Sequence, residues 1–154
     1  MSRKFCAVRP EIWIGKFFRK MDVDSKLLAI YLRTSPQFQM IGIFYIPLEI
    51  IIKHTGLTLS VVESCLKQLE KIHYLRFDLE LEVVWVVDMA VSQISSGGLS
   101  QPQRKGVINE LARLSEEEYP FVAEWLNLYG EKYQISHDEI SFSTAWESNQ
   151  TNTM

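Results

Sequence analysis

Between residues 42 and 87, the pattern of hydrophobic and polar residues changes from that of a strand to that of helices and back to strands. Residues 42–46 form a β-prone run closed by Pro47, a residue that suits the first turn of a helix. The next apolar residues recur at helical spacing: Leu48, Ile51 and Ile52. This segment therefore predicts a strand followed by a helix over residues 48–55.

A second helix and a hairpin are predicted directly after the first helix. Gly56 can adopt the left-handed conformation that ends a helix, and Thr58 is a good N-cap for the next helix. The apolar residues of that helix fall on one face: Val62, Cys65, Leu66, Leu69 and Ile72. Residues 75–79 then alternate, and residues 83–87 have the composition of a buried strand. This order predicts an α+β fold, a winged helix-turn-helix.

The N-terminal third is expected to complete the same core. Pro10 leads into a short helical stretch, and Asp24 or Ser25 is expected to cap a further helix that Pro36 stops. We expect four aromatic side chains of this region in the core: Trp13, Phe17, Phe18 and Tyr31. In the last strand, Trp85 is expected to be buried against Leu66 and Leu69.

The chain is predicted to divide into four parts. These are a winged-helix domain (1–94), a flexible Ser/Gly linker (95–103), a C-terminal helical extension (104–133) and a polar, disordered tail (134–154). The last helix of the extension should start near Pro120 and end at Gly130. It carries an apolar stripe: Phe121, Val122, Trp125, Leu128 and Tyr129.

Charge is distributed unevenly along the chain. Residues 1–76 hold 12 Lys and Arg against 6 Asp and Glu, whereas residues 77–154 hold 4 against 13. The formal charges are therefore +6 and −9, which agrees with the net charge of −3 for the whole chain. A basic half is typical of a phosphate-binding surface, although it is also compatible with an ordinary soluble surface.

The two cysteines and the hydropathy pattern indicate a compartment. Cys6 and Cys65 lie in apolar surroundings far apart in the sequence, which favours free thiols in a reducing compartment, while one disulfide stays possible. No apolar segment is long enough for a signal peptide or a membrane span, because Pro47 and Glu49 interrupt the longest one. We expect a cytoplasmic protein, in the host cytoplasm if a phage encodes it.

The chain resembles the N-terminal winged-helix domain of phage replication initiators of the DnaD-like, replisome-organiser type. The resemblance covers about residues 5–94, and residues 120–130 also resemble the connector helix that follows such domains. The residues that carry it are Trp13, Tyr31, Leu32, Gly42, Ile43, Phe44, Thr55, Gly56, Leu57, Thr58, Leu66, Leu69 and the run Val83, Val84, Trp85, Val86 and Val87. The resemblance implies DNA binding, recruitment of a helicase or its loader, and self-association.

No pattern of catalytic or metal-ligating residues stands out. His54, His73 and His137 lack cysteines or carboxylates at metal spacing, and Gly97 with Gly98 does not form a phosphate-binding loop. We therefore expect no enzyme activity, no cofactor, no metal and no small-molecule substrate.

The second helix of the predicted motif would read the major groove. Its solvent-facing lysines can meet phosphate or guanine, and its serines and glutamine can hydrogen-bond base edges. No arginine lies on this face, so a strong bidentate guanine contact is missing. The candidate DNA-binding residues are Lys53, Ser60, Ser64, Lys67, Gln68 and Lys71.

The predicted wing is acidic. Asp78, Glu80 and Glu82 lie at or beside the hairpin turn, and phosphate repulsion would oppose their insertion into a groove. This favours a protein contact or a second copy of the chain, although a solvated hairpin tip is also possible. The candidate partner-binding residues are Asp78, Glu80, Glu82, Phe121, Trp125 and Tyr129.

Two hypotheses follow for the function. The first is a non-enzymatic protein of phage or mobile-element type that binds double-stranded DNA in replication initiation or its regulation. The alternative is a module for protein interaction or oligomerisation that docks on a host or phage complex without productive DNA binding.

Overall fold

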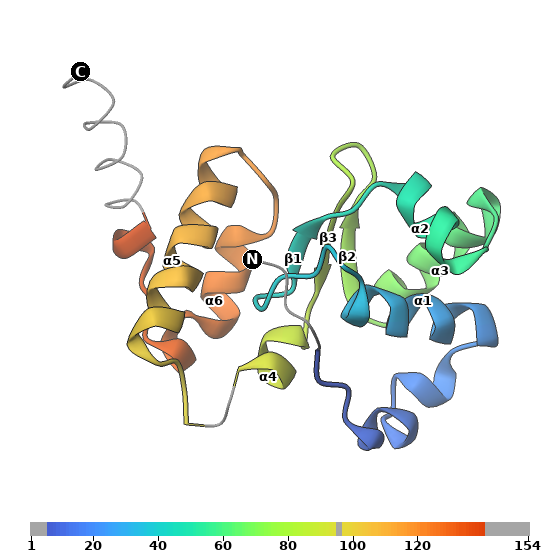
Figure 1. The fold of residues 1–154 in the computed structure, drawn as a ribbon, viewed down its shortest axis with the longest axis horizontal. Helices are drawn as coiled ribbons and strands as arrows, with labels where there is room; N and C mark the ends of the chain where they lie inside the picture. Colours follow the sequence, from blue (N-terminus) through green and yellow to red (C-terminus); the bar gives the residue numbers. More distant parts are fainter. Residues whose placement is uncertain (1–5, 95–96, 141–154) are drawn as a thin grey trace. The chain divides into compact units, whose positions relative to one another are not determined.

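The computed structural model describes residues 6–94 and 97–140, and the chain divides into two compact units, residues 1–94 and 95–154 (Figure 1). The first unit combines helices with a small three-stranded antiparallel sheet, and the second is formed by helices. The α+β class and the C-terminal helices are therefore confirmed.

The first unit begins with two short 3-10 turns before the first α-helix. Its elements are, in order, the turns Pro10–Ile14 and Phe18–Lys20, α1 (Val23–Thr34), β1 (Ile43–Tyr45), α2 (Leu48–Thr55), α3 (Leu59–Lys71), β2 (Leu75–Asp78), β3 (Val83–Val86) and α4 (Met89–Gln93). The expected succession of strand, helix, helix and hairpin is present. The cap of α1 is Asp22, whose carboxylate accepts from the Ser25 N–H, rather than Asp24 or Ser25.

The turn between α2 and α3 forms as its residue types predict. Gly56 has φ 78° and donates its N–H to the Ile52 carbonyl, which ends α2. The Thr58 hydroxyl accepts from the N–H of Val61 and so caps α3. Three residues therefore join the two helices, and α3 packs against both α1 and α2.

The core of this unit lies between the helices and one face of the sheet (Figure 1). Buried side chains of α3 face the sheet residues Phe44, Val84 and Val86: Val62, Cys65, Leu66 and Leu69. Phe18 is buried and Phe17 packs against this cluster, but Trp13 is 57% exposed, so the prediction that it lies in the core was wrong. Trp13 instead rests edge-on against Phe18, with ring centroids 5.4 Å apart.

The strand register places Trp85 on the other face of the sheet. β3 is the central strand, and Trp85 pairs with Ile43 of β1 and Arg76 of β2. Successive side chains of a strand point to opposite faces of the sheet, so the Trp85 side chain is on the face away from Val84 and Val86. Trp85 is buried, as expected, but it is not part of the cluster that contains Leu66 and Leu69.

Gly42 allows the chain to pass close to the end of β3. Its φ is +86°, and a Cβ atom there would lie 2.6 Å from the Val86 carbonyl oxygen. The Val86 N–H donates to the Gly42 carbonyl, so the two backbones are in direct contact. Only glycine fits this position without displacement.

The second unit is built on α5 (Gln101–Glu116) and α6 (Val122–Tyr133). Ser100 and Gln103 form a capping box at the start of α5, so the last three residues of the predicted linker are helical. Gly130 does not end α6. It is needed inside the helix because a Cβ atom would lie 2.7 Å from the Ile135 carbonyl oxygen.

The predicted disordered tail is ordered at its beginning. Residues 137–140 are helical, and Ile135 and Ile140 are buried. The prediction was therefore wrong for residues 134–140, and residues 141–154 lie outside the described part. Across the described ranges, no helix is long and apolar enough to span a membrane.

Candidate nucleic-acid interface

The outer face of α3 carries a stripe of polar side chains. Its members are exposed and follow one another at helical spacing: Ser60, Ser64, Lys67 and Lys71. They lie opposite the buried face of the helix, so burial of Val62 and Leu66 presents this stripe to solvent. The structure thus brings together four of the six residues predicted to contact DNA. We call these four residues the α3 stripe.

Lys53 lies in the last turn of α2 and is exposed, just before the turn that leads to α3. The neighbouring His54 anchors this end of α2, because its Nδ1 lies 2.7 Å from the Tyr31 hydroxyl on α1. Partial burial raises the pKa of the Tyr31 hydroxyl, because desolvation disfavours its ionised form. The end of α2 is therefore held against α1 beside an available lysine.

Gln68 lies at the margin of α3 rather than in the α3 stripe. Its Oε1 accepts from the Ser25 hydroxyl at 3.2 Å, and Ser25 is buried in α1. The amide oxygen is therefore occupied in holding α3 against α1, which leaves this side chain less free to contact a base.

The charges of α3 are divided between its sides. Glu63 and Glu70 line a shallow groove of about 150 Å³ between α3 and β2, together with Phe77 and Leu79. Lys67 borders the same groove, whereas Lys71 does not line it. The two lysines of the stripe thus offset the two carboxylates on the same helix, and only Lys71 lies away from the groove.

The hairpin uses two of its three predicted partner-binding carboxylates internally. The Leu81 N–H donates to Asp78 Oδ1 at 2.8 Å, which closes the hairpin turn. The Leu48 N–H donates to Glu82 Oε2 at 2.6 Å, which caps the start of α2. Glu80 is exposed at the tip. The sequence pattern did not reveal these roles.

The other predicted partner-binding residues lie in and beside α6. Phe121, Trp125 and Tyr129 are all buried, whereas Leu128 of the same stripe is 53% exposed. The Trp125 and Tyr129 rings lie 5.5 Å apart, and Tyr133 stacks against Trp125. The stripe therefore forms an aromatic cluster within α6.

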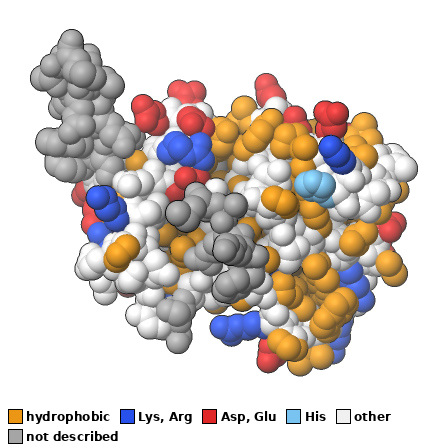
Figure 2. Space-filling model, viewed as in Figure 1, with side chains coloured by type: hydrophobic (Ala, Val, Ile, Leu, Met, Phe, Trp, Pro, Cys, Tyr) orange, Lys and Arg blue, Asp and Glu red, His pale blue; other side chains and the backbone are white. Residues whose placement is uncertain are grey.

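An apolar surface with basic residues was not anticipated from the sequence. Figure 2 shows hydrophobic side chains together with Lys and Arg at the lower right, where α1 and the turns before it lie. The exposed apolar residues of this region include Trp13, Ile14, Val23 and Leu27. Exposed Lys16, Arg19 and Lys20 lie between them in the sequence.

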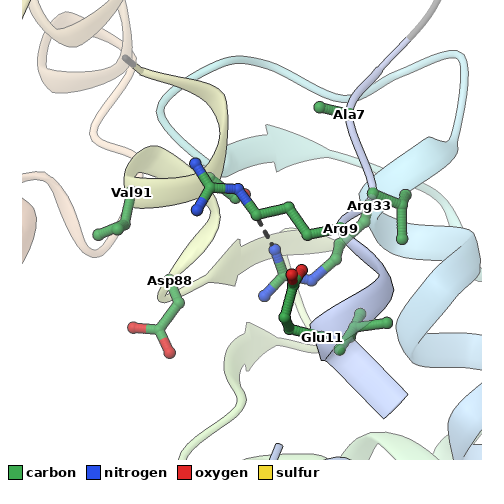
Figure 3. Close-up of a pocket in the computed structure, with 9 residues that line it drawn as sticks. Ala7, Arg9, Glu11, Arg33, Asp88 and Val91 are labelled. Carbon is green, nitrogen blue, oxygen red and sulfur yellow. Dashed lines mark hydrogen bonds between the residues drawn. The ribbon is translucent and has the colours of Figure 1, made fainter. Parts of the chain in front are cut away.

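A pocket of about 470 Å³ lies between the N-terminal segment, α1 and α4. Figure 3 shows Arg9 and Arg33 reaching into this space from the N-terminal segment and from α1. Asp88 and Val91 border it from the α4 side, and Glu11 lies beside the arginines. The residues of this set come from three segments that lie far apart in the sequence, so no motif in the chain marked it.

Arg33 is held by contacts at the base of the pocket. Its Nε donates to the Tyr74 hydroxyl at 2.6 Å, and its Nη1 donates to Ser92 Oγ at 3.1 Å. Burial raises the pKa of Tyr74, and the nearby guanidinium partly opposes this shift. The Tyr74 hydroxyl in turn donates to the Ala29 carbonyl, so the guanidinium has a fixed orientation.

Within the described ranges, no group of three or more His, Cys, Asp or Glu side chains could hold a metal ion. Cys6 and Cys65 are both free, and burial raises the pKa of the Cys65 thiol. Comparisons of the chain with family models, with curated proteins and with solved structures found no match.

Proposed function

We propose that the first unit is a winged helix-turn-helix that binds duplex DNA through α3 and has no catalytic role. The observation that carries this proposal is the α3 stripe, which faces solvent directly after the tight turn from α2. A helix presented in this way can enter a major groove, while the helix before it lies across the backbone.

The lysines and the serines of the interface would make different contacts with DNA. Lys67 and Lys71 neutralise phosphates or meet guanine, and the Ser60 and Ser64 hydroxyls bond base edges or phosphate oxygens. Lys53 adds a phosphate contact from the end of α2. With no arginine in the stripe, most of the binding free energy comes from phosphate contacts, so sequence preference is modest.

In the proposed interface, the hairpin of β2 and β3 supports α2 and does not contact DNA. Its Glu82 carboxylate caps that helix, and its exposed Glu80 would be repelled by phosphate. The biological setting we propose is replication initiation or its regulation in a phage or mobile element, as the resemblance of residues 5–94 implies.

A gel-shift series on random duplex tests the proposal. The double variant Lys67→Glu and Lys71→Glu should bind well over tenfold more weakly at low salt, because it loses two phosphate contacts and adds repulsion. The matched control is Lys105→Glu with Lys132→Glu, which changes the net charge equally at exposed positions outside α3. Equal binding of both folded variants would remove α3 from the interface.

A protein-interaction module is the alternative function, and the hairpin tip favours it. Leu79 and Leu81 are 56% and 43% exposed on either side of Glu80, an arrangement that suits a protein surface better than a phosphate backbone. The variant Leu79→Ser with Leu81→Ser separates the two functions. It should leave duplex binding intact if α3 binds DNA, and it should lose the partner if the tip is a protein contact.

A further inference from the structure

We propose that the pocket between Arg9, Arg33 and α4 binds a nucleoside 5′-phosphate. Its lining residues come from the N-terminal segment, α1 and α4, and none comes from α2 or α3. The proposal is therefore independent of the DNA-binding function of the α3 stripe.

Three of the four charged side chains of the pocket have no polar partner in the described part of the chain. Arg9, Glu11 and Asp88 make no side-chain hydrogen bond or ion pair within the described residues, although they line the same pocket as Arg33. Charged groups that are not paired with each other gain more binding free energy from a complementary ligand than paired groups do. Pairing already uses their hydrogen-bonding capacity.

The two guanidinium groups together provide an anion site. The Arg33 group is held in place, and the Arg9 group is free to move. Arg33 spends two of its five N–H donors on Tyr74 and Ser92, so three donors remain in a fixed orientation. Arg9 is exposed and can close over a ligand from the N-terminal segment. Two arginines suit a dianionic phosphate, because each can donate two parallel hydrogen bonds to its oxygens.

The two carboxylates of the pocket disfavour the binding of phosphate alone. They favour a ligand that also carries hydrogen-bond donors. Glu11 and Asp88 would repel phosphate alone, but both can accept hydrogen bonds from the hydroxyls of a ribose or from an exocyclic amine. Val8, Ile12 and Val91 add apolar lining that can contact the faces of a base. The volume of about 470 Å³ is within the range usual for small-molecule sites.

Isothermal titration of the full chain with AMP, adenosine and inorganic phosphate tests the assignment. AMP should bind saturably, and adenosine and phosphate should each bind at least about tenfold more weakly, because each offers half of the required contacts. A short oligonucleotide with a 5′-phosphate should displace AMP if the natural ligand is a nucleic-acid end. If the oligonucleotide does not displace AMP, the natural ligand is a free mononucleotide.

The variant Arg9→Ala should weaken AMP binding by at least about tenfold. This substitution leaves the fold intact because the Arg9 side chain has no partner within the described residues, and an amide-correlation NMR spectrum confirms folding. Arg19→Ala, an exposed arginine outside the pocket, is the matched control. Asp88→Asn should weaken AMP binding and strengthen phosphate binding.

Three results would overturn the proposal. They are the absence of AMP binding at millimolar concentration, binding that is equal in Arg9→Ala and Arg19→Ala, and phosphate that binds as tightly as AMP. Duplex binding measured on the Arg9→Ala variant keeps the two functions separate, since it should match that of the unaltered chain if the α3 stripe alone contacts DNA.

Discussion

The Glu82 carboxylate caps α2 by accepting a hydrogen bond from the Leu48 N–H, with 2.6 Å between the two atoms. Pro47 precedes Leu48 and has no side-chain acceptor, so the cap comes from the hairpin 34 residues later in the chain. The Ile46 N–H also donates to the Glu82 carbonyl. The hairpin thus fixes where α2 begins, and with it the position of the turn that leads into α3.

Removal of this cap should destabilise the first unit. Glu82→Ala should lower the free energy of unfolding by about 1 kcal/mol, the usual cost of losing a helix cap. Glu80→Ala is the matched control, because it removes the same charge from the same turn at an exposed position. Urea unfolding followed by circular dichroism measures the stability of the two variants. Equal urea midpoints for Glu82→Ala and Glu80→Ala would show that the Glu82 hydrogen bond adds no stability.

The elements that rest on local signals could be predicted from the sequence. Gly56 and Thr58 marked the end of α2 and the start of α3, because left-handed backbone and hydroxyl caps act within a few residues. The apolar period of α3 identified its buried face. Helix α4 was missed, since its five residues are too few to show a period.

The features that depend on distant contacts could not be predicted. Glu82 pairs with a backbone group remote in sequence, so its pattern indicated only an acidic turn. Trp85 was expected to be buried against Leu66 and Leu69, but an uninterrupted apolar strand does not show which of its residues face which side of the sheet. The pocket at Arg33 likewise joins three segments, and no spacing in the chain marks their meeting.

Two glycines with left-handed backbone should respond differently to alanine. Gly42→Ala should lower the free energy of unfolding by roughly 2–4 kcal/mol, because backbone strain adds to the clash with the Val86 carbonyl. Gly56→Ala should cost only about 1 kcal/mol, since no atom lies within 4 Å of its Cβ position. Thermal melts of the two variants compare strain with and without a clash. Similar losses would mean that the approach of Gly42 to Val86 is relaxed in solution.

The second unit contains a carboxylate whose protonation should weaken it. Hydrogen bonds from Arg104 and from the Ser136 N–H hold the pKa of Glu139 below its ordinary value of 4.5. Because the ionised form is favoured in the folded state, its stabilisation is present above pH 4.5 and is lost as the pH falls through the lowered pKa. The loss should be less than about 1 kcal/mol, since water screens this partly exposed pair.

An NMR titration of the Glu139 side-chain carboxyl measures this effect directly. The midpoint should lie below 4.5 in the unaltered chain and should rise in Arg104→Ala, which removes the largest cause of the shift. Arg113→Ala is the matched control, because Arg113 pairs with Glu110 and Glu117 instead. A midpoint that does not move in Arg104→Ala would show that the ion pair does not form in solution.

The salt dependence of duplex binding distinguishes phosphate contacts from base contacts on the α3 stripe. Each phosphate neutralised by a lysine contributes about 0.9 to the slope of log affinity against log salt concentration. Lys67→Ala with Lys71→Ala should therefore reduce the magnitude of that slope by about 1.8. Ser60→Ala with Ser64→Ala should lower affinity without changing the slope, because a hydroxyl releases no counterion. Filter binding at four salt concentrations gives both slopes. If the lysine variant keeps the slope of the unaltered chain, Lys67 and Lys71 do not contact phosphate, and the phosphate contacts of the proposed interface lie elsewhere.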